Sequence, residues 1–378
     1  MMTIRERVLA VFQGEQPEVV PWLGDLTYWA GAMGTQGKLP DRYKGEGIVQ
    51  LHKDLRCGIY VPYFPGSYAV LWRTEFYGYE VESRSEGGIT RRTIKTPVGT
   101  LEEELRYCPE SFSWGYTKRM VSTPQDLEVV QYIEQHKRVI PDPAGYERMD
   151  RLYGDQGVAI PCMPRTPYAR LLVEYAGIVN TSYLIADAPE EFQRTLDILR
   201  ETDDPYYEVA AKCPAKFIFI ADNLSSEAVS PPLFRKYSLP YFQKRIRQLH
   251  DAGKWVLTHV DGTLRGFLPV LRETGIDCIE SIVPAPVGDL PVEAIRREAG
   301  RDLILWGWIP GALFSPTFPE AQFREYVKNV ILTLKPNPRF VLAVADQVPP
   351  DAVIERVPLV AEIADQYGAA TPRRSARG

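Results

Sequence analysis

The chain has 378 residues, of which 45% are hydrophobic and 11% aromatic, enough for a sizeable buried core. Its formal net charge of -5 excludes nucleic acid as the main partner, because no surplus of basic residues is present to neutralise phosphates. The five cysteines form no CxxC pair and no run approaches the roughly 20 apolar residues of a membrane span, so we expect a soluble cytoplasmic protein without a zinc ribbon or disulfide framework.

Short apolar runs rich in Val, Ile and aromatic residues predict eight β-strands. In chain order they cover residues 19–23, 59–63, 157–162, 217–221, 255–257, 277–281, 303–306 and 340–344. Helical patterns separate most of them; residues 231–252, for example, begin with proline and end before Gly253. This alternation is typical of a (β/α)8 TIM barrel, which we expect to form one domain over residues 1–370. An open doubly wound sheet is the alternative, but no GxGxxG turn follows the first strand.

Residues 75–107 interrupt the alternation, because apolar and polar residues alternate there between glycine- and proline-containing turns. That pattern predicts an antiparallel β meander inserted after the second strand. Helical segments near 124–135 and 144–153 follow before the barrel pattern resumes. We therefore expect the insertion to cover about residues 75–155, and residues 371–378 to form a flexible tail.

In a TIM barrel the catalytic residues lie at the carboxyl ends of the strands. His259 and Asp261 follow one predicted strand, and their two-residue spacing puts both side chains on one side of an extended backbone, where they can converge on one ligand. The other polar or aromatic candidates at predicted strand ends are Asp25, Tyr63, Asp222, Asn223, Glu280, Trp306, Trp308, Asp346 and Gln347. Carboxylates are rarely buried without a partner, so these acids indicate a polar, anionic pocket floor.

The candidates also have structural interpretations. His259 can be a buried, hydrogen-bonded histidine, and Asp25 and Asp222 can cap the turn or helix that follows. Glu280 can face the helix layer, because a one-residue error in the strand reverses its side. Aromatic residues near the strand ends favour a flat or methylated ligand, although ordinary packing at the barrel rim also accounts for them. No glycine-rich nest or Ser/Thr–Lys motif supports a phosphate site.

Several segments carry a family resemblance, which covers nearly the whole chain. They are residues 3–21, 222–223, 229–237, 239–240, 253–277, which include His259-Val-Asp261-Gly262, and 306–310. In these segments the chain resembles the uroporphyrinogen decarboxylase superfamily. The resemblance implies a TIM barrel. It is less specific about the reaction, because the superfamily holds both haem-pathway decarboxylases and cobalamin-dependent methyltransferases.

The departures from the decarboxylase argue against haem-pathway decarboxylation. The decarboxylase has an arginine-rich motif after its first strand that binds the carboxylates of its substrate, whereas this chain has Asp25 and no arginine there. Where the decarboxylase has a histidine after its last strand, this chain has Asp346-Gln347. A pocket lined by carboxylates would repel a polycarboxylate porphyrinogen.

The methyltransferase branch typically binds zinc through His-x-Cys after the fifth strand and a Cys after the eighth. The corresponding residues here are His259, Asp261 and Asp346, a set that could hold zinc or another divalent metal; a site without metal is the alternative. The absence of both thiolates argues against a thiol as methyl acceptor. It leaves a methyl donor whose oxygen or nitrogen needs Lewis-acid or general-acid help.

The resemblance therefore implies a methyltransferase that moves a methyl group from a small methoxylated or N-methylated compound to the corrinoid of a partner protein. The partner must reach the carboxyl-terminal mouth of the barrel, because this chain has no cobalamin-binding motif of its own. We expect His259, Asp261 and Asp222 to be the catalytic residues. A homodimer stays open. So do a divergent decarboxylase with Arg165 or Arg265 in its pocket, a lyase or hydrolase, and a ligand-binding barrel without activity.

Overall fold

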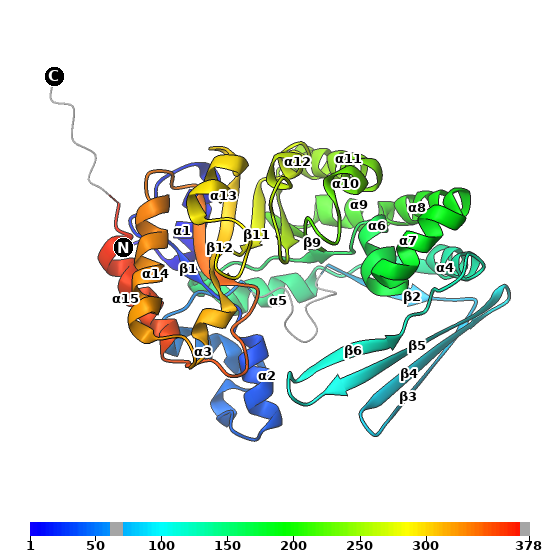
Figure 1. Cartoon of the computed structure of the whole chain (residues 1–378), viewed down its shortest axis with the longest axis horizontal. Coiled ribbons are helices and arrows are strands. Elements are labelled where there is room, and N and C mark those ends of the chain that lie inside the picture. The colour runs from blue at the N-terminus through cyan, green and yellow to red at the C-terminus, as the bar shows by residue number, and fades with distance from the viewer. Residues whose placement is uncertain (61–70, 371–378) are drawn as a thin grey trace.

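The computed structural model describes residues 1–60 and 71–370, which form a parallel β-barrel surrounded by helices with an antiparallel sheet beside it (Figure 1). The strands are β1 (Trp22–Leu23), β2 (Trp72–Phe76), β3 (Glu80–Glu86), β4 (Ile89–Thr96), β5 (Gly99–Cys108), β6 (Ser113–Lys118), β7 (Lys137–Pro141), β8 (Cys162–Met163), β9 (Phe217–Leu224), β10 (Trp255–Val260), β11 (Cys278–Ile282), β12 (Ile304–Pro310) and β13 (Phe340–Ala345).

The helices follow the barrel strands and the insertion. They are α1 (Ile4–Gln13), α2 (Thr27–Thr35), α3 (Ile48–Asp54), α4 (Asp126–Gln135), α5 (Ala144–Tyr153), α6 (Pro167–Arg170), α7 (Gly177–Asp187), α8 (Pro189–Thr202), α9 (Asp204–Lys212), α10 (Pro231–Tyr237), α11 (Leu239–Asp251), α12 (Leu268–Arg272), α13 (Val292–Ala299), α14 (Glu320–Leu334) and α15 (Arg356–Tyr367). In the described part of the chain, no helix combines the length and apolar character needed to cross a membrane.

A parallel sheet forms the barrel wall, with the strand order β1-β13-β12-β11-β10-β9-β8. Two parallel bridges close the circle, one from Leu23 to Gly58 and one from Ile59 to Gly157. Gly157 permits this close approach, because a Cβ atom there would lie 1.7 Å from the carbonyl oxygen of Ile59. The predicted TIM barrel is confirmed, and its second strand contributes only isolated bridges among the described residues.

Helix α1 closes the amino-terminal end of the barrel. It begins with a capping box between Thr3 and Glu6, and its buried Val8, Val11 and Phe12 join the core inside the barrel. The Phe12 ring packs at 4.9 Å from Phe217, at the start of β9. Because this end is filled with apolar side chains, the polar residues of the barrel interior are confined to the opposite end.

A second, larger core lies between the strands and the surrounding helices. Helix α14 shows how it forms: Phe323, Val327, Ile331 and Leu334 recur at helical spacing and are fully buried or nearly so. Burial of each such side chain stabilises the fold by about 1.5–3 kcal/mol. The strands are therefore apolar on both faces over most of their length, as expected for a parallel sheet covered by helices.

The insertion forms the antiparallel sheet β3-β4-β5-β6 and a separate antiparallel pair of β2 with β7. The predicted meander is confirmed, and it continues beyond residue 107 to Lys118. Helices α4 and α5 correspond to the two predicted helical segments, whereas β7 between them was not predicted. The hydroxyl of Tyr28 on α2 donates a hydrogen bond to the carbonyl oxygen of Ser111. The β5–β6 hairpin therefore contacts the helix that follows the first barrel strand (Figure 1).

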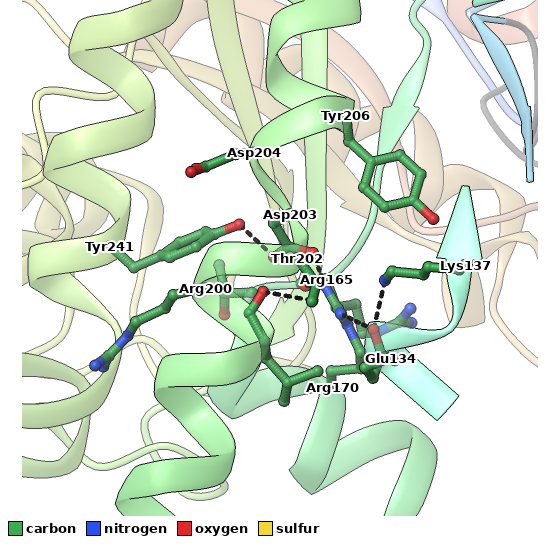
Figure 2. A network of polar contacts seen from close by, with 12 residues as sticks. Glu134, Lys137, Arg165, Arg170, Arg200, Thr202, Asp203, Asp204, Tyr206 and Tyr241 are labelled. Atoms are coloured by element: carbon green, nitrogen blue, oxygen red, sulfur yellow. Dashed lines mark hydrogen bonds and ion pairs between the residues drawn. The ribbon is translucent and has the colours of Figure 1, made fainter. Parts of the chain in front are cut away.

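A buried network of charges fastens the insertion to the barrel (Figure 2). The guanidinium of Arg170 lies 3.1 Å from Glu134 on α4 and 2.7 Å from Asp203, and Lys137 of β7 also pairs with Glu134. The Tyr241 hydroxyl donates to Asp203 at 2.6 Å. Burial alone would raise the pKa of Glu134, but the charges of Arg170 and Lys137 outweigh it and lower that pKa to about 2.

Candidate functional site

His259 and Glu280 meet inside the carboxyl-terminal end of the barrel. They occupy paired positions on the neighbouring strands β10 and β11, and His259 Nδ1 lies 2.6 Å from Glu280 Oε2. The other oxygen of Glu280 accepts a hydrogen bond of 2.9 Å from the Tyr60 hydroxyl. Each of the three side chains is 3% exposed. Glu280 thus faces the barrel interior and not the helix layer.

The surroundings of His259 favour its charged form. Burial by itself would lower the imidazole pKa, but the charge and hydrogen bond of Glu280 act against burial, and the charges of Asp346 and Asp261 add to them. The net effect is a raised pKa, so the imidazolium persists to higher pH than in an unperturbed histidine. No hydrogen bond to His259 Nε2 is present among the described residues, which leaves this nitrogen available to a ligand.

Two more carboxylates, Asp25 and Asp346, follow the neighbouring strands β1 and β13. Asp25, 2% exposed, accepts hydrogen bonds from the Thr27 amide at 2.7 Å and from Gln347 Nε2 at 2.9 Å. Burial raises its pKa, the hydrogen bonds oppose that rise, and the charge of Glu280 adds to it. Asp346 is more open to solvent, yet desolvation and the charges of Glu280, Asp261 and Asp25 raise its pKa to about 6 against the opposing effect of His259. These acids interact electrostatically across the mouth of the barrel.

The backbone is strained at four strand ends around this group. Among the non-glycine residues described, Asn223, Ser281, Trp308 and Asp346 have positive φ angles of 47°, 69°, 91° and 62°. They lie at the ends of β9, β11, β12 and β13, respectively. Such conformations cost about 1–3 kcal/mol each and concentrate at functional sites. The strained backbone at these four residues therefore lowers the stability of the barrel mouth.

A chain of polar contacts runs along the ends of β8, β9 and β10. Arg165 donates from Nη2 to Asn223 Oδ1 at 3.0 Å, and Asn223 donates from Nδ2 to the exposed Asp261 at 3.4 Å. Asp222 accepts hydrogen bonds from the Thr166 amide at 2.8 Å and from its hydroxyl at 2.5 Å. The predicted catalytic residue Asp222 thus supports the loop that carries Arg165, and among the described residues it has no hydrogen bond to His259.

The predicted aromatic residues lie in different parts of the structure. Trp306 is fully buried inside the barrel, where its ring packs 4.7 Å from that of Tyr60. Trp308 departs from the expectation, because the positive φ angles of Gly307 and Trp308 break the two-residue alternation. Its indole packs in the outer core and donates to the Leu305 carbonyl oxygen at 3.1 Å. Tyr63 lies outside the described residues.

The sequence groups Tyr60 with the aromatic residues near the strand ends, but Tyr60 is not among the predicted site residues. It lies inside a predicted strand and not at its end, so nothing in the local pattern distinguishes it from a core aromatic. No local pattern can reveal that its partner, Glu280, lies 220 residues further along the chain. Arg165 was named only for the decarboxylase alternative, yet it donates a hydrogen bond to the predicted site residue Asn223 at the barrel mouth.

The predicted metal set does not fit the arrangement described. His259, Asp261 and Asp346 affect one another's charge, but among residues 1–60 and 71–370 no three His, Cys, Asp or Glu side chains are grouped so that they could hold a metal ion. The His259 Nδ1 atom is engaged by Glu280, which leaves one nitrogen for any ligand. The metal stays a prediction from the sequence.

A comparison with protein families shows which family this chain belongs to. The family model of uroporphyrinogen decarboxylase (URO-D) matches residues 169–367, more than half of the chain. The chain belongs to the URO-D family. The match covers β9 to β13, and thus His259, Glu280 and Asp346, whereas Asp25, Arg165 and the antiparallel sheet of this URO-D family member lie outside it. A comparison with curated proteins finds no match.

One solved structure shares the fold of this URO-D family member. A methyltransferase from Methanosarcina mazei is 15% identical and superposes with a TM-score of 0.61 over 98% of this chain and 100% of the other. A D-psicose 3-epimerase from Clostridium cellulolyticum H10 is 7% identical over 60% of this chain and 84% of the other, with a TM-score of 0.37. At these identities the first likeness establishes a shared fold alone, and the second carries no argument about function.

Proposed function

We propose that this URO-D family member is a methyltransferase that takes a methyl group from the oxygen or nitrogen of a small compound. The observation that carries the proposal is the buried His259–Glu280 pair, with Nδ1 and Oε2 2.6 Å apart and the imidazole pKa raised. Loss of a methyl group leaves negative charge on the oxygen, or a lone pair on the nitrogen, of the donor. A positioned imidazolium can protonate that atom as the carbon–heteroatom bond breaks.

In this reaction His259 acts as general acid and Glu280 as the residue that positions and charges it. Glu280 holds the imidazole through Nδ1, and Tyr60 in turn orients Glu280, so the Nε2 proton is directed away from this pair. The proton moves from Nε2 to the leaving heteroatom, and the electron pair of the broken bond to carbon accepts it. Burial of the pair restricts water, which strengthens the electrostatic contribution.

The methyl acceptor belongs to a partner in this proposal. The cobalt of a corrinoid carried by a separate protein would accept the methyl group at the carboxyl-terminal mouth. The M. mazei methyltransferase, which shares the fold over 98% of this chain, supports methyl transfer as the reaction. The open position of Asp346 and Asp261 at the same end is consistent with access from outside.

A divergent decarboxylase is the second candidate, and Arg165 at the barrel mouth favours it. An arginine there can hold a substrate carboxylate, and the same imidazolium can protonate the carbon left when CO₂ departs with cleavage of its C–C bond. The two reactions differ in product. Methyl transfer yields the free hydroxyl or amine, whereas decarboxylation yields CO₂.

The test is a panel of methoxylated and N-methylated compounds incubated with the protein and free reduced cobalamin as surrogate acceptor. Mass spectrometry follows the demethylated product and a separate trap follows CO₂. We expect demethylation, with His259→Gln reducing the rate by about 10²–10⁴-fold. His250→Gln is the matched control, because His250 pairs with Asp277 at the amino-terminal end of β11 and should leave the rate unchanged. CO₂ release without demethylation would favour the decarboxylase, and no turnover of any compound would contradict both.

A further inference from the structure

Arg165 stands out in a mouth otherwise surrounded by acids. Its guanidinium is 21% exposed and lies two residues beyond the end of β8, beside the ends of β9 and β10 that carry Asn223 and Asp261. Its charge reaches the barrel interior, because it opposes the burial that raises the pKa of the Cys162 thiol to about 12. It also opposes the burial that raises the pKa of Asp222 to about 6. Through Asn223 the guanidinium is linked to Asp261, whose charge acts on His259.

The surrounding contacts hold the Arg165 loop in place from three directions. Arg170, itself buried in the charge network, donates from Nη2 to the Arg165 carbonyl oxygen at 2.9 Å (Figure 2). Asp222 fixes the next residue through the Thr166 amide, and Asn223 accepts from the guanidinium itself. A loop built this way can present a side chain to a ligand with little loss of conformational entropy on binding.

Not all of the N–H donors of the Arg165 guanidinium have hydrogen-bond partners among the described residues. Its Nε is buried and has no hydrogen-bond partner among the described residues. Its ion pair with Glu174 is 3.5 Å long, and the Glu174 side chain is 43% exposed. Glu174 lies in a π-helical turn over Leu171–Tyr175, a local irregularity that is frequent at functional sites. An arginine whose side chain is 21% exposed and whose one ion pair is 3.5 Å long is suited to bind a carboxylate with its planar fork.

We infer that Arg165 is the carboxylate-recognition residue of this site, so the methyl donor is an acid and not a neutral compound. The inference rests on the proposed function and narrows its substrate class. Strands β8 and β10 are two strand spacings apart, roughly 10 Å. That is the scale of one aromatic ring with a carboxylate at one side and a methoxy group at the other. Such a molecule would pair its carboxylate with Arg165 and bring its ether oxygen toward His259, with the acids around His259 repelling the reverse orientation.

The test measures binding, without any methyl acceptor, by calorimetry with two probes, 4-methoxybenzoate and 4-methoxybenzyl alcohol. The two share ring and methoxy group and differ in charge. We expect the wild-type protein to prefer the carboxylate, and Arg165→Gln to weaken carboxylate binding by about 10-fold or more with little change for the alcohol, as for loss of a charge-assisted hydrogen bond. Arg235→Gln is the matched control, because Arg235 is 47% exposed and paired with Glu273 away from the strand ends; it should leave both affinities unchanged.

A second variant keeps the inference falsifiable should Arg165→Gln fail to fold. Glu174→Gln removes the competing carboxylate and should tighten binding of 4-methoxybenzoate several-fold. A wild-type protein without carboxylate preference, an equal loss of both probes in Arg165→Gln, or no gain in Glu174→Gln would overturn the inference. Since binding is read without turnover, a carboxylate preference can stand even when no methyl transfer is found, and methyl transfer can stand when the preference is absent.

Discussion

His259 and Glu280 occupy paired positions on two neighbouring parallel strands, and their side chains point to the same side of the sheet with Nδ1 and Oε2 2.6 Å apart. Both are buried, so the carboxylate charge acts on the imidazole with little screening. The pair therefore behaves as a charged acid held in one orientation. The chemistry proposed above depends on that charge, which makes the pH dependence of the reaction its most direct consequence.

Glu280→Gln should move the alkaline limb of the pH–rate profile to lower pH. As general acid His259 must be protonated, so the rate falls as pH rises through its pKa. Burial lowers that pKa and Glu280 is the largest influence that raises it, so removal of the carboxylate charge lowers it again. Steady-state rates between pH 5 and 9 measure the shift. Glu273→Gln, which removes an exposed partner of Arg235, should leave the limb in place. An unmoved limb in Glu280→Gln would show that another group titrates.

Asp346→Asn should stabilise the fold above pH 6. Desolvation first, and then neighbouring acids, raise the Asp346 pKa from 3.8 to about 6, so the folded state binds this proton more tightly than the unfolded state. The resulting stability is present at low pH and is lost as pH rises from about 4 through about 6. Thermal melts at pH 4 and pH 8 should therefore show a gain only at pH 8, of the order of 1 kcal/mol because solvent screens this exposed group. An equal effect at both pH values would rule out titration of Asp346 as the cause.

Arg170→Met should destabilise the protein by about 3–5 kcal/mol, because it leaves Glu134 and Asp203 buried without their main cation. Denaturant unfolding measures the loss. Arg324→Met is the control: Arg324 pairs with Glu320 at 2.9 Å on the exposed face of α14, where ion pairs contribute less than about 1 kcal/mol. Similar losses in the two variants would mean that the network does not anchor the insertion.

Metal content tests the ligand set predicted from the sequence. Since the described residues do not group His259, Asp261 and Asp346 around a common point, dialysis against EDTA should leave both the turnover rate and the melting temperature unchanged. Elemental analysis before and after dialysis provides the measurement. One divalent ion per chain, lost again in His259→Ala with the barrel still folded, would restore the metal set and replace general-acid help with Lewis-acid help.

The barrel and the meander could both be predicted from the amino-acid sequence. Both follow from local physics, since hydrophobic periodicity, turn residues and helix ends are properties of neighbouring residues. The sequence also placed His259, Glu280, Asp25 and Asp346 at one end, because parallel strands end together. Which of these residues contact one another depends on how distant parts of the chain come together in the folded protein. Glu280 contacts Tyr60 across 220 positions, and Asp25 contacts Gln347 across 322.

Backbone strain was likewise beyond the reach of the sequence. The positive φ angles at Gly307 and Trp308 turn Trp308 away from the barrel interior, against its two-residue spacing from Trp306. No local pattern signals this, because a strained conformation is held by the packing around it and not by the preference of the residue itself. The pKa values of His259 and Asp346 depend in the same way on charges brought together by folding, which the order of residues along the chain does not reveal.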